Sequence, residues 1–441
     1  MESVLNYILG VLVVLIGLAV SIGLHEIGHL VPAKLFGIRV TQYMIGFGPT
    51  LWSRRRGETE YGIKLLPLGG YISMVGMYIP AKPSATESRK LGYFRRMIQD
   101  AREHAAEGLQ AGDETRMFVA KPVWQRIIVM LGGPFMNLAL AVVLFGILLM
   151  VIGVPERTTT IRSVLECVPT TVSSQAECTS DDEPSPAKKA GFTPGDVILD
   201  VNGQRVDEWS EFTTDVAENP GETLLVTVER AGREMQLKLT PVAIERADVD
   251  SAGREILRDG KPVMVTVGYA GLSTQVATVR KDSAAVLSVT GATIGETANL
   301  ITHLPQKIAG VVQSTVSGEE RDPNGPISVV GIGAVAGEVV SASGATVEGR
   351  VSTLIGMIAS LNIALFLFNL IPLLPLDGGH VAAALWEAVR RGFARALKRP
   401  DPGPVDTAKF VPVTFAIVIL LVSVSAVLIW ADIVNPVSLF G

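Results

Sequence analysis

Charge is scarce in this sequence. Of its 441 residues, 18% are charged and 48% are hydrophobic, and the mean hydropathy is +0.39. Soluble domains carry about 25% charged residues, so the composition excludes an ordinary soluble protein. The formal net charge is −5, so the basic surface that nucleic-acid binding needs is also lacking. The composition instead predicts a membrane protein.

The features of a cleavable signal peptide are missing as well. The residues "MES" ahead of the first apolar run are acidic rather than basic, and no A-x-A site follows that run. The run is also longer than the apolar region of a signal peptide. We therefore expect it to be a retained membrane helix.

Four apolar stretches approach or exceed the roughly 20 residues that a spanning helix needs. They predict a polytopic α-helical membrane protein with four transmembrane helices. Lysine and arginine concentrate in residues 34–121 and 390–409, which the positive-inside rule places in the cytoplasm. Both termini and the long segment 155–350 are then expected outside the membrane. The four stretches are Val4–Leu24 with its continuation, Ile127–Val154, Leu354–Leu376 and Val411–Trp430.

The chain has only two cysteines, Cys167 and Cys178, and both lie in the segment expected outside. A disulfide between them suits an oxidising compartment and would stabilise the fold by roughly 3 kcal/mol. Two free thiols in a loop are the alternative.

Two segments between the apolar stretches have β patterns. Residues 45–77 are glycine-rich, with apolar stretches on both sides of "PLGG", which predicts membrane-associated β-hairpins. Residues 185–241 combine a short helix, strands and the turn Asn202-Gly203, a type I′ signal. This order resembles a PDZ domain of bacterial proteases over roughly residues 158–245. Amphipathic helices at the outer membrane surface are expected after it.

The stretch "SIGLHEIGHLVPAK" (21–34) places His25, Glu26 and His29 inside the first apolar run. Positions i and i+4 share one face of a helix, so both imidazoles can reach one metal ion. H-E-x-x-H is the zinc metalloprotease signature, in which the glutamate is the general base. Polar groups satisfied within a helix bundle are the alternative, but ionisable groups are costly at this depth.

A catalytic zinc ion normally has three protein ligands. "FNLIPLLPLDGGH" (368–380) follows the third apolar stretch, and its prolines predict a broken helix. Asp377 in this stretch is an oxygen donor at a depth similar to that of His25, and it is our preferred third ligand. His380 is the competing ligand.

These motifs together resemble the site-2 protease family of intramembrane zinc metalloproteases, in the bacterial, actinobacterial-like form that regulates sigma factors and carries a PDZ domain. The resemblance implies one Zn²⁺ held by His25, His29 and Asp377, with Glu26 as the catalytic base. It also implies substrate contacts by Asn369 and, from "GGPFMN" (132–137), by Asn137, which alternatively only ties helices together. The implied partners are single-pass membrane substrates, such as anti-sigma factors already trimmed outside, in a bacterial plasma membrane.

Two other functions fit parts of the pattern. Intramembrane histidines also occur in transporters and sensors, although the chain lacks the internal repeat typical of transporters. A catalytically silent scaffold is the other alternative, against which the intact Glu26 argues.

The expected segments are the first transmembrane helix with H-E-x-x-H (1–44), the β-hairpin region (45–79), a cytoplasmic insertion (80–122), the second transmembrane helix (123–154), an extracytoplasmic PDZ domain (155–250), an outer amphipathic segment (251–350), the third transmembrane helix with L-D-G-G (351–385), a cytoplasmic loop (386–410) and the fourth transmembrane helix (411–432).

Overall fold

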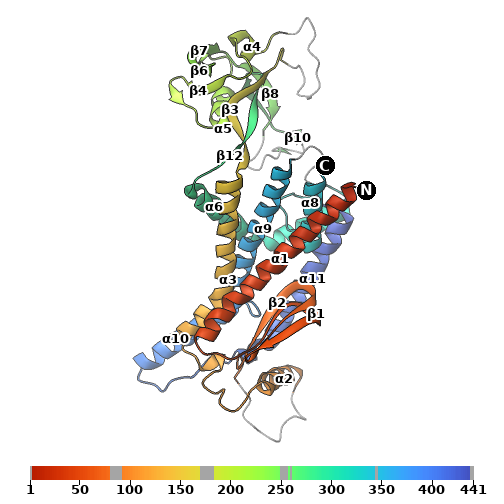
Figure 1. The fold of residues 1–441 in the computed structure, drawn as a ribbon, viewed down its shortest axis with the longest axis vertical. Helices are drawn as coiled ribbons and strands as arrows, with labels where there is room; N and C mark the ends of the chain where they lie inside the picture. Colours follow the sequence, from red (N-terminus) through yellow and green to blue (C-terminus); the bar gives the residue numbers. More distant parts are fainter. Residues whose placement is uncertain are drawn as a thin grey trace. The chain divides into compact units, whose positions relative to one another are not determined.

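The computed structural model describes residues 2–79, 92–168, 183–248, 257–258, 261–342 and 346–437. The chain forms two compact units. The first comprises Met1–Gly153 and Arg280–Gly441, and the second comprises Val154–Val279 (Figure 1).

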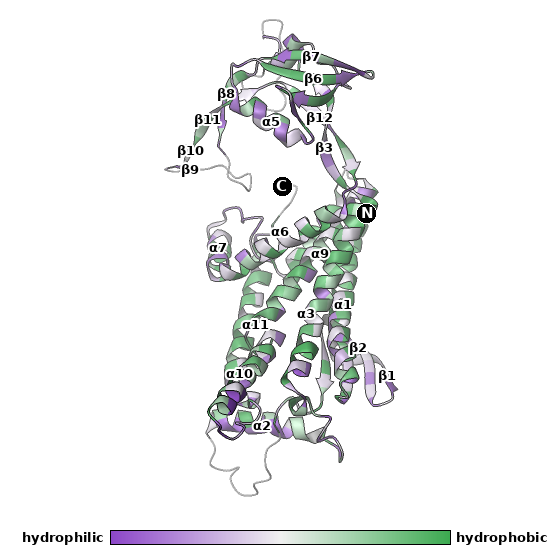
Figure 2. Ribbon diagram, turned by 90° about the vertical axis from the view of Figure 1, so that its left-hand side faces the viewer, coloured by the Kyte–Doolittle hydropathy of each residue, from purple (hydrophilic) through white to green (hydrophobic). Residues whose placement is uncertain are grey.

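Within the described residues, the first unit contains four helices that are long and apolar enough to cross a bilayer (Figure 2). The prediction of a multi-pass helical membrane protein is therefore confirmed. The apolar spans are Val4–Leu35, Val123–Ile152, Val347–Leu370 and Thr407–Val434. They belong to helices α1 (Glu2–Leu35), α3 (Val123–Gly146, continued by the wider turn η2, Ile147–Ile152), α9 (Val347–Leu370) and α11 (Val411–Val434, preceded by η3, Thr407–Phe410).

Helix α1 packs against α3 and against the short apolar helix α8 (Val329–Ser341), and α3 packs against α9. Small residues allow the close approach that is usual between membrane helices. A Cβ atom on Gly28 would lie 2.2 Å from the carbonyl oxygen of Gly132, so α1 and α3 touch through their backbones. Asn362 of α9 donates a hydrogen bond of 2.8 Å to the hydroxyl of Ser21, which joins α9 to α1.

Strands β1 (Val40–Arg56) and β2 (Thr59–Met74) form one antiparallel hairpin in the segment where the sequence predicts hairpins. The hydroxyl of Tyr43 donates a bond of 2.8 Å to the carbonyl of Gly23, so the base of the hairpin is held on α1. Farther out, the hairpin exposes large apolar side chains: Phe47, Leu51, Trp52, Ile63, Leu65 and Leu66. This exposure suits a hairpin that meets lipid or protein rather than water.

The third apolar helix breaks where its prolines predict. Helix α9 ends at Leu370, and α10 (Asp377–Ala396) begins after a six-residue turn, residues 371–376, that contains Pro372 and Pro375. A buried ion pair holds α10 on α3, since the Arg126 guanidinium lies 2.5 Å from the Glu387 carboxylate. Separating the two side chains would leave a buried charge without its partner, which is strongly destabilising.

The remaining helices of this unit surround the four spanning helices. They are α2 (Tyr93–Glu107), the single turn η1 (Phe118–Ala120), α6 (Ser283–Thr302) and α7 (Leu304–Ser317). Arg321, which follows α7, pairs with Asp432 of α11 at 2.6 Å, and both side chains are 1% exposed. This pair ties the segment between α7 and α8 to the end of α11.

The second unit is a twisted antiparallel sheet with two helices. Its strand order is β12–β3–β4–β6–β7, with β5 beside β4, and β8 pairs separately with β11. Because β12 pairs with β3, the unit extends to Val279 and ends later than the expected residue 250. The elements are β3 (Val154–Val164), α4 (Pro186–Ala190), β4 (Val197–Val201), β5 (Gln204–Arg205), α5 (Trp209–Glu218), β6 (Leu224–Arg230), β7 (Arg233–Leu239), β8 (Val242–Ala247), β9 (Leu257–Arg258), β10 (Lys261–Pro262), β11 (Met264–Tyr269) and β12 (Leu272–Val279).

The core of this unit contains Phe212 of α5 and the inward side chains of β3, β4 and β6. Asn202 has φ of 54°, as the predicted Asn-Gly turn requires. Cys167 is buried, whereas Cys178 lies outside the described residues. The bridge between the two cysteines stays a prediction.

Candidate metal centre

A hydrogen bond to α3 fixes the imidazole ring of His29 and leaves its Nε2 atom available to a metal ion. Its Nδ1 atom lies 2.8 Å from the carbonyl oxygen of Val129 on α3, and a carbonyl can only accept. The Nδ1 atom therefore carries the proton, and Nε2 keeps its lone pair. A hydrogen bond of this kind usually fixes the tautomer of a histidine that binds a metal.

His25 is oriented by Asn137, a fully buried residue of α3. The Asn137 amide nitrogen lies 3.0 Å from Nδ1 of His25, while its Oδ1 is buried without a hydrogen-bond partner. A 180° rotation of the amide exchanges these two atoms. Oδ1 then accepts the Nδ1 proton of His25, which leaves Nε2 of His25 with its lone pair for a metal ion.

Asp377 completes a triangle of donor atoms. The Nε2 atoms of His25 and His29 are 3.1 Å apart, and each lies 3.3 Å from Oδ2 of Asp377. Zinc bonds of about 2.0–2.1 Å at tetrahedral angles hold ligand atoms about 3.3–3.4 Å apart. Oδ2 of Asp377 is also buried without a hydrogen bond. The three residues therefore fit a zinc ion.

Two of the other histidines, His303 and His380, do not join this group. Among the described residues, His25, His29 and Asp377 are the one set of three metal-binding side chains close enough to share an ion. His380 lines the cavity beside them without belonging to the set. His303 is exposed at the end of α6, where its Nδ1 lies 2.9 Å from the carbonyl of Asn299.

Glu26 faces the cavity next to the triangle. This cavity of about 290 Å³ is bordered by α1, β2, α3 and the turn before α10. The Glu26 side chain is 8% exposed, and β2 runs close beside it, since a Cβ atom on Gly70 would lie 3.1 Å from Cγ of Glu26. A carboxylate, a metal-binding triangle and an open space thus meet at one point.

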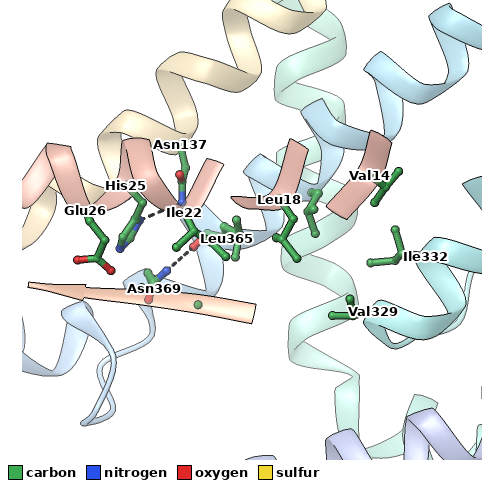
Figure 3. A pocket seen from close by; sticks show the side chains of 13 residues that line it. Val14, Leu18, Ile22, His25, Glu26, Asn137, Val329, Ile332, Leu365 and Asn369 are labelled. Atoms are coloured by element: carbon green, nitrogen blue, oxygen red, sulfur yellow. Dashed lines mark hydrogen bonds between the residues drawn. The ribbon is translucent and has the colours of Figure 1, made fainter. Parts of the chain in front are cut away.

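A second, mostly apolar cavity of about 360 Å³ runs from His25 and Glu26 along α1 (Figure 3). Its far end is formed by Val329 and Ile332 of α8. Asn369 of α9 lines both cavities, and its amide nitrogen donates a 3.0 Å bond to the carbonyl of Leu365. The Oδ1 atom of Asn369 is therefore the group that this side chain can present to a ligand. The other lining residues are Val14, Leu18, Ile22, Gly69, Gly70, Asn137, Leu361 and Leu365.

The structure brings together all the predicted ligands, Glu26 and both predicted asparagines. Sequence reasoning missed the glycines that make room for them. A Cβ atom on Gly133 would lie 2.3 Å from Nε2 of His29 and 2.8 Å from Cε1 of His25, so only glycine fits there. The pair Gly132-Gly133 ahead of Pro134 was the available signal.

Comparison with known proteins gives consistent matches over nearly the whole chain. The profile of Peptidase family M50 matches residues 13–399. The sequence is 32% identical to the zinc metalloprotease Rip1 of Mycobacterium tuberculosis over 446 residues, covering 98% of this chain and 99% of the relative. It is 28% identical to the metalloprotease MmpA of Caulobacter vibrioides, covering 88% and 90%. It is 25% identical to the regulator of sigma-W protease RasP of Bacillus subtilis, covering 93% and 94%.

Proposed function

The chain belongs to peptidase family M50, and on that premise we propose that His25, His29 and Asp377 hold its zinc ion while Glu26 is the catalytic base. The protein is an intramembrane zinc metalloprotease of the kind used in regulated proteolysis. The observation that carries the assignment of residues is the triangle of donor atoms, which has the spacing of zinc ligands and lies beside Glu26 and a cavity.

When bound, zinc supplies a Lewis acid that polarises the scissile carbonyl and acidifies a neighbouring water molecule. Glu26 takes the proton of the attacking water on its carboxylate and passes it to the leaving amine. Asn137 keeps the lone pair of His25 pointing at the metal and acts through His25 as a positioning residue. Asn369 offers Oδ1 to a backbone N–H of the substrate.

The substrate segment enters in extended form, because the amides of an intact helix are already hydrogen-bonded. The apolar cavity along Val14, Leu18 and Ile22 suits the side chains of a transmembrane segment. We assign single-pass membrane proteins of the anti-sigma type as substrates, which is supported by the relative whose name is regulator of sigma-W protease. A transporter or scaffold would not need a zinc triangle beside a carboxylate.

The zinc content of the protein is expected to depend on all three residues of the triangle. Purified wild-type protein should hold about one zinc ion per chain, and His25→Ala, His29→Ala and Asp377→Ala should each lose most of it, because two ligands hold zinc poorly. His380→Ala is the matched control and should keep its zinc. Metal analysis of the purified variants measures this, and an Asp377→Ala variant with full zinc alongside a depleted His380→Ala variant would make His380 the third ligand.

We further propose that the second unit is a PDZ domain outside the cytoplasmic membrane, and that α2 and the loop after α10 lie in the cytoplasm. The distribution of basic residues supports this orientation. In intact cells, a membrane-impermeant thiol reagent should label Gln236→Cys, whereas Pro402→Cys should react only after the membrane is opened. The reverse labelling would invert the topology.

A further inference from the structure

Helix α10 has an apolar face that no part of the described chain covers. Near the metal centre its residues 377–384 are partly or fully buried, and Glu387 is fully buried against α3. From Leu385 onward, α10 and the residue that follows it expose five large apolar side chains, each between 45% and 67% exposed. They are Leu385, Trp386, Val389, Phe393 and Leu397.

These five side chains form one continuous stripe. Positions three or four residues apart share a helix face, and the series 385, 389, 393 and 397 follows that spacing, with Trp386 beside it. The stripe lies away from the face that packs through Glu387 onto Arg126. It therefore points out of the unit.

Basic residues accompany the stripe. The charge of Arg391 is neutralised within the protein, because its guanidinium pairs with Glu387 at 3.1 Å and with Asp401 at 3.3 Å. Arg395, Lys398 and Arg399 are exposed, and the described residues give them no ion pair. The segment 385–399 thus combines an apolar stripe with unneutralised positive charge.

The position of α10 indicates what covers this stripe. Six residues separate the end of the apolar span Val347–Leu370 from the start of α10, and α10 lies at one end of the spanning helices (Figures 1 and 2). A helix at this place is expected at a membrane surface. An amphipathic helix with basic residues at such a surface buries its apolar side among acyl chains and places its charges at anionic headgroups. We infer that residues 385–399 form a docking surface for anionic phospholipid.

Tryptophan fluorescence tests this inference in the full-length protein. The protein is reconstituted in phosphatidylcholine vesicles that contain either brominated phosphatidylglycerol or brominated phosphatidylcholine in equal amount. The signal of Trp386 is the difference between wild type and Trp386→Phe. Phosphatidylglycerol brominated near the headgroup end of its chains should quench this signal several-fold more than the matching phosphatidylcholine, because each basic residue near an anionic surface enriches the lipid roughly fivefold.

The charged residues provide the matched comparison. Arg395→Gln/Lys398→Gln should bring the two lipids to nearly equal quenching, whereas Arg233→Gln/Lys238→Gln, an equal loss of exposed charge in the second unit, should leave the difference intact. Zinc content should stay at the wild-type level in both variants, which shows that they fold. These outcomes are independent of the peptidase assignment.

Two results would overturn the inference. Equal quenching by both lipids in the wild-type protein would mean that the stripe has no preference for anionic headgroups. Absence of quenching, together with a Phe393→Cys disulfide between two chains, would assign the stripe to contact with a second copy of the protein.

Discussion

Glu26→Gln should cleave its substrate about 100- to 10,000-fold more slowly than wild type, the range that a general base contributes. The glutamine side chain has nearly the same shape but cannot accept the proton of the attacking water. Since the two imidazoles and Asp377 form the triangle, the variant should keep its zinc. The measurement is the rate of fragment formation from a single-pass membrane substrate in proteoliposomes, with metal analysis of the same sample.

Glu296→Gln is the matched control, because Glu296 is an exposed glutamate on α6 of the same unit. It should cleave like the wild type. Wild-type rates in Glu26→Gln would remove Glu26 from the mechanism, and loss of zinc in that variant would make the carboxylate part of the metal site instead.

Gly133→Ala should lose zinc as completely as a ligand variant does. The added methyl group would occupy the space of Nε2 of His29 and Cε1 of His25, at 2.3 and 2.8 Å. One or both rings must turn away, and the triangle with Asp377 opens. We expect metal affinity to fall by at least about 100-fold, the upper end for disturbed outer-shell contacts, because here the ligands themselves move. Competition with a zinc chelator measures the change.

Gly146→Ala on the same helix is the control, since nothing lies within 4 Å of a Cβ atom added there. Removing a helix glycine should slightly stabilise the protein, by roughly 0.5–1 kcal/mol, and leave zinc binding unchanged. Wild-type affinity in Gly133→Ala would mean that α1 and α3 can separate without disturbing the two imidazoles.

The parts of the site that depend on helix periodicity were predictable. His25 and His29 share a face because they are four residues apart in an apolar helix. The prediction of Asp377 as the third ligand needed one further inference, namely that the proline-broken third span ends at a depth in the membrane similar to that of His25. The partners on α3 could not be found this way. The carbonyl of Val129 carries no side-chain signal, and the contact of Asn137 with His25 depends on how closely α1 and α3 approach.

Part of the fold was likewise predictable from the sequence, and part was not. The four spanning helices follow from their length and hydropathy, but the end of the second unit does not. Strand β12 pairs with β3 across a sequence separation of more than a hundred residues, and local pattern does not reveal such pairing. Residues 386–410 were predicted to be the cytoplasmic loop between the third and fourth spanning helices, without any secondary structure. Within this connection α10 continues to Ala396, and the ion pair between Glu387 and Arg126 stabilises the helix beyond the site.

The metal centre joins α1, which is synthesised first, to α10, which is synthesised near the end. While the ribosome is still producing the second unit, the membrane already contains both imidazoles and Glu26, but Asp377 does not yet exist. Two imidazoles alone bind zinc weakly, so a growing or prematurely terminated chain has no competent centre. On the proposed ligand assignment, the order of the ligands along the sequence delays peptidase activity until the third spanning helix and the start of α10 have been made, and it protects the surrounding membrane proteins from copies that end earlier.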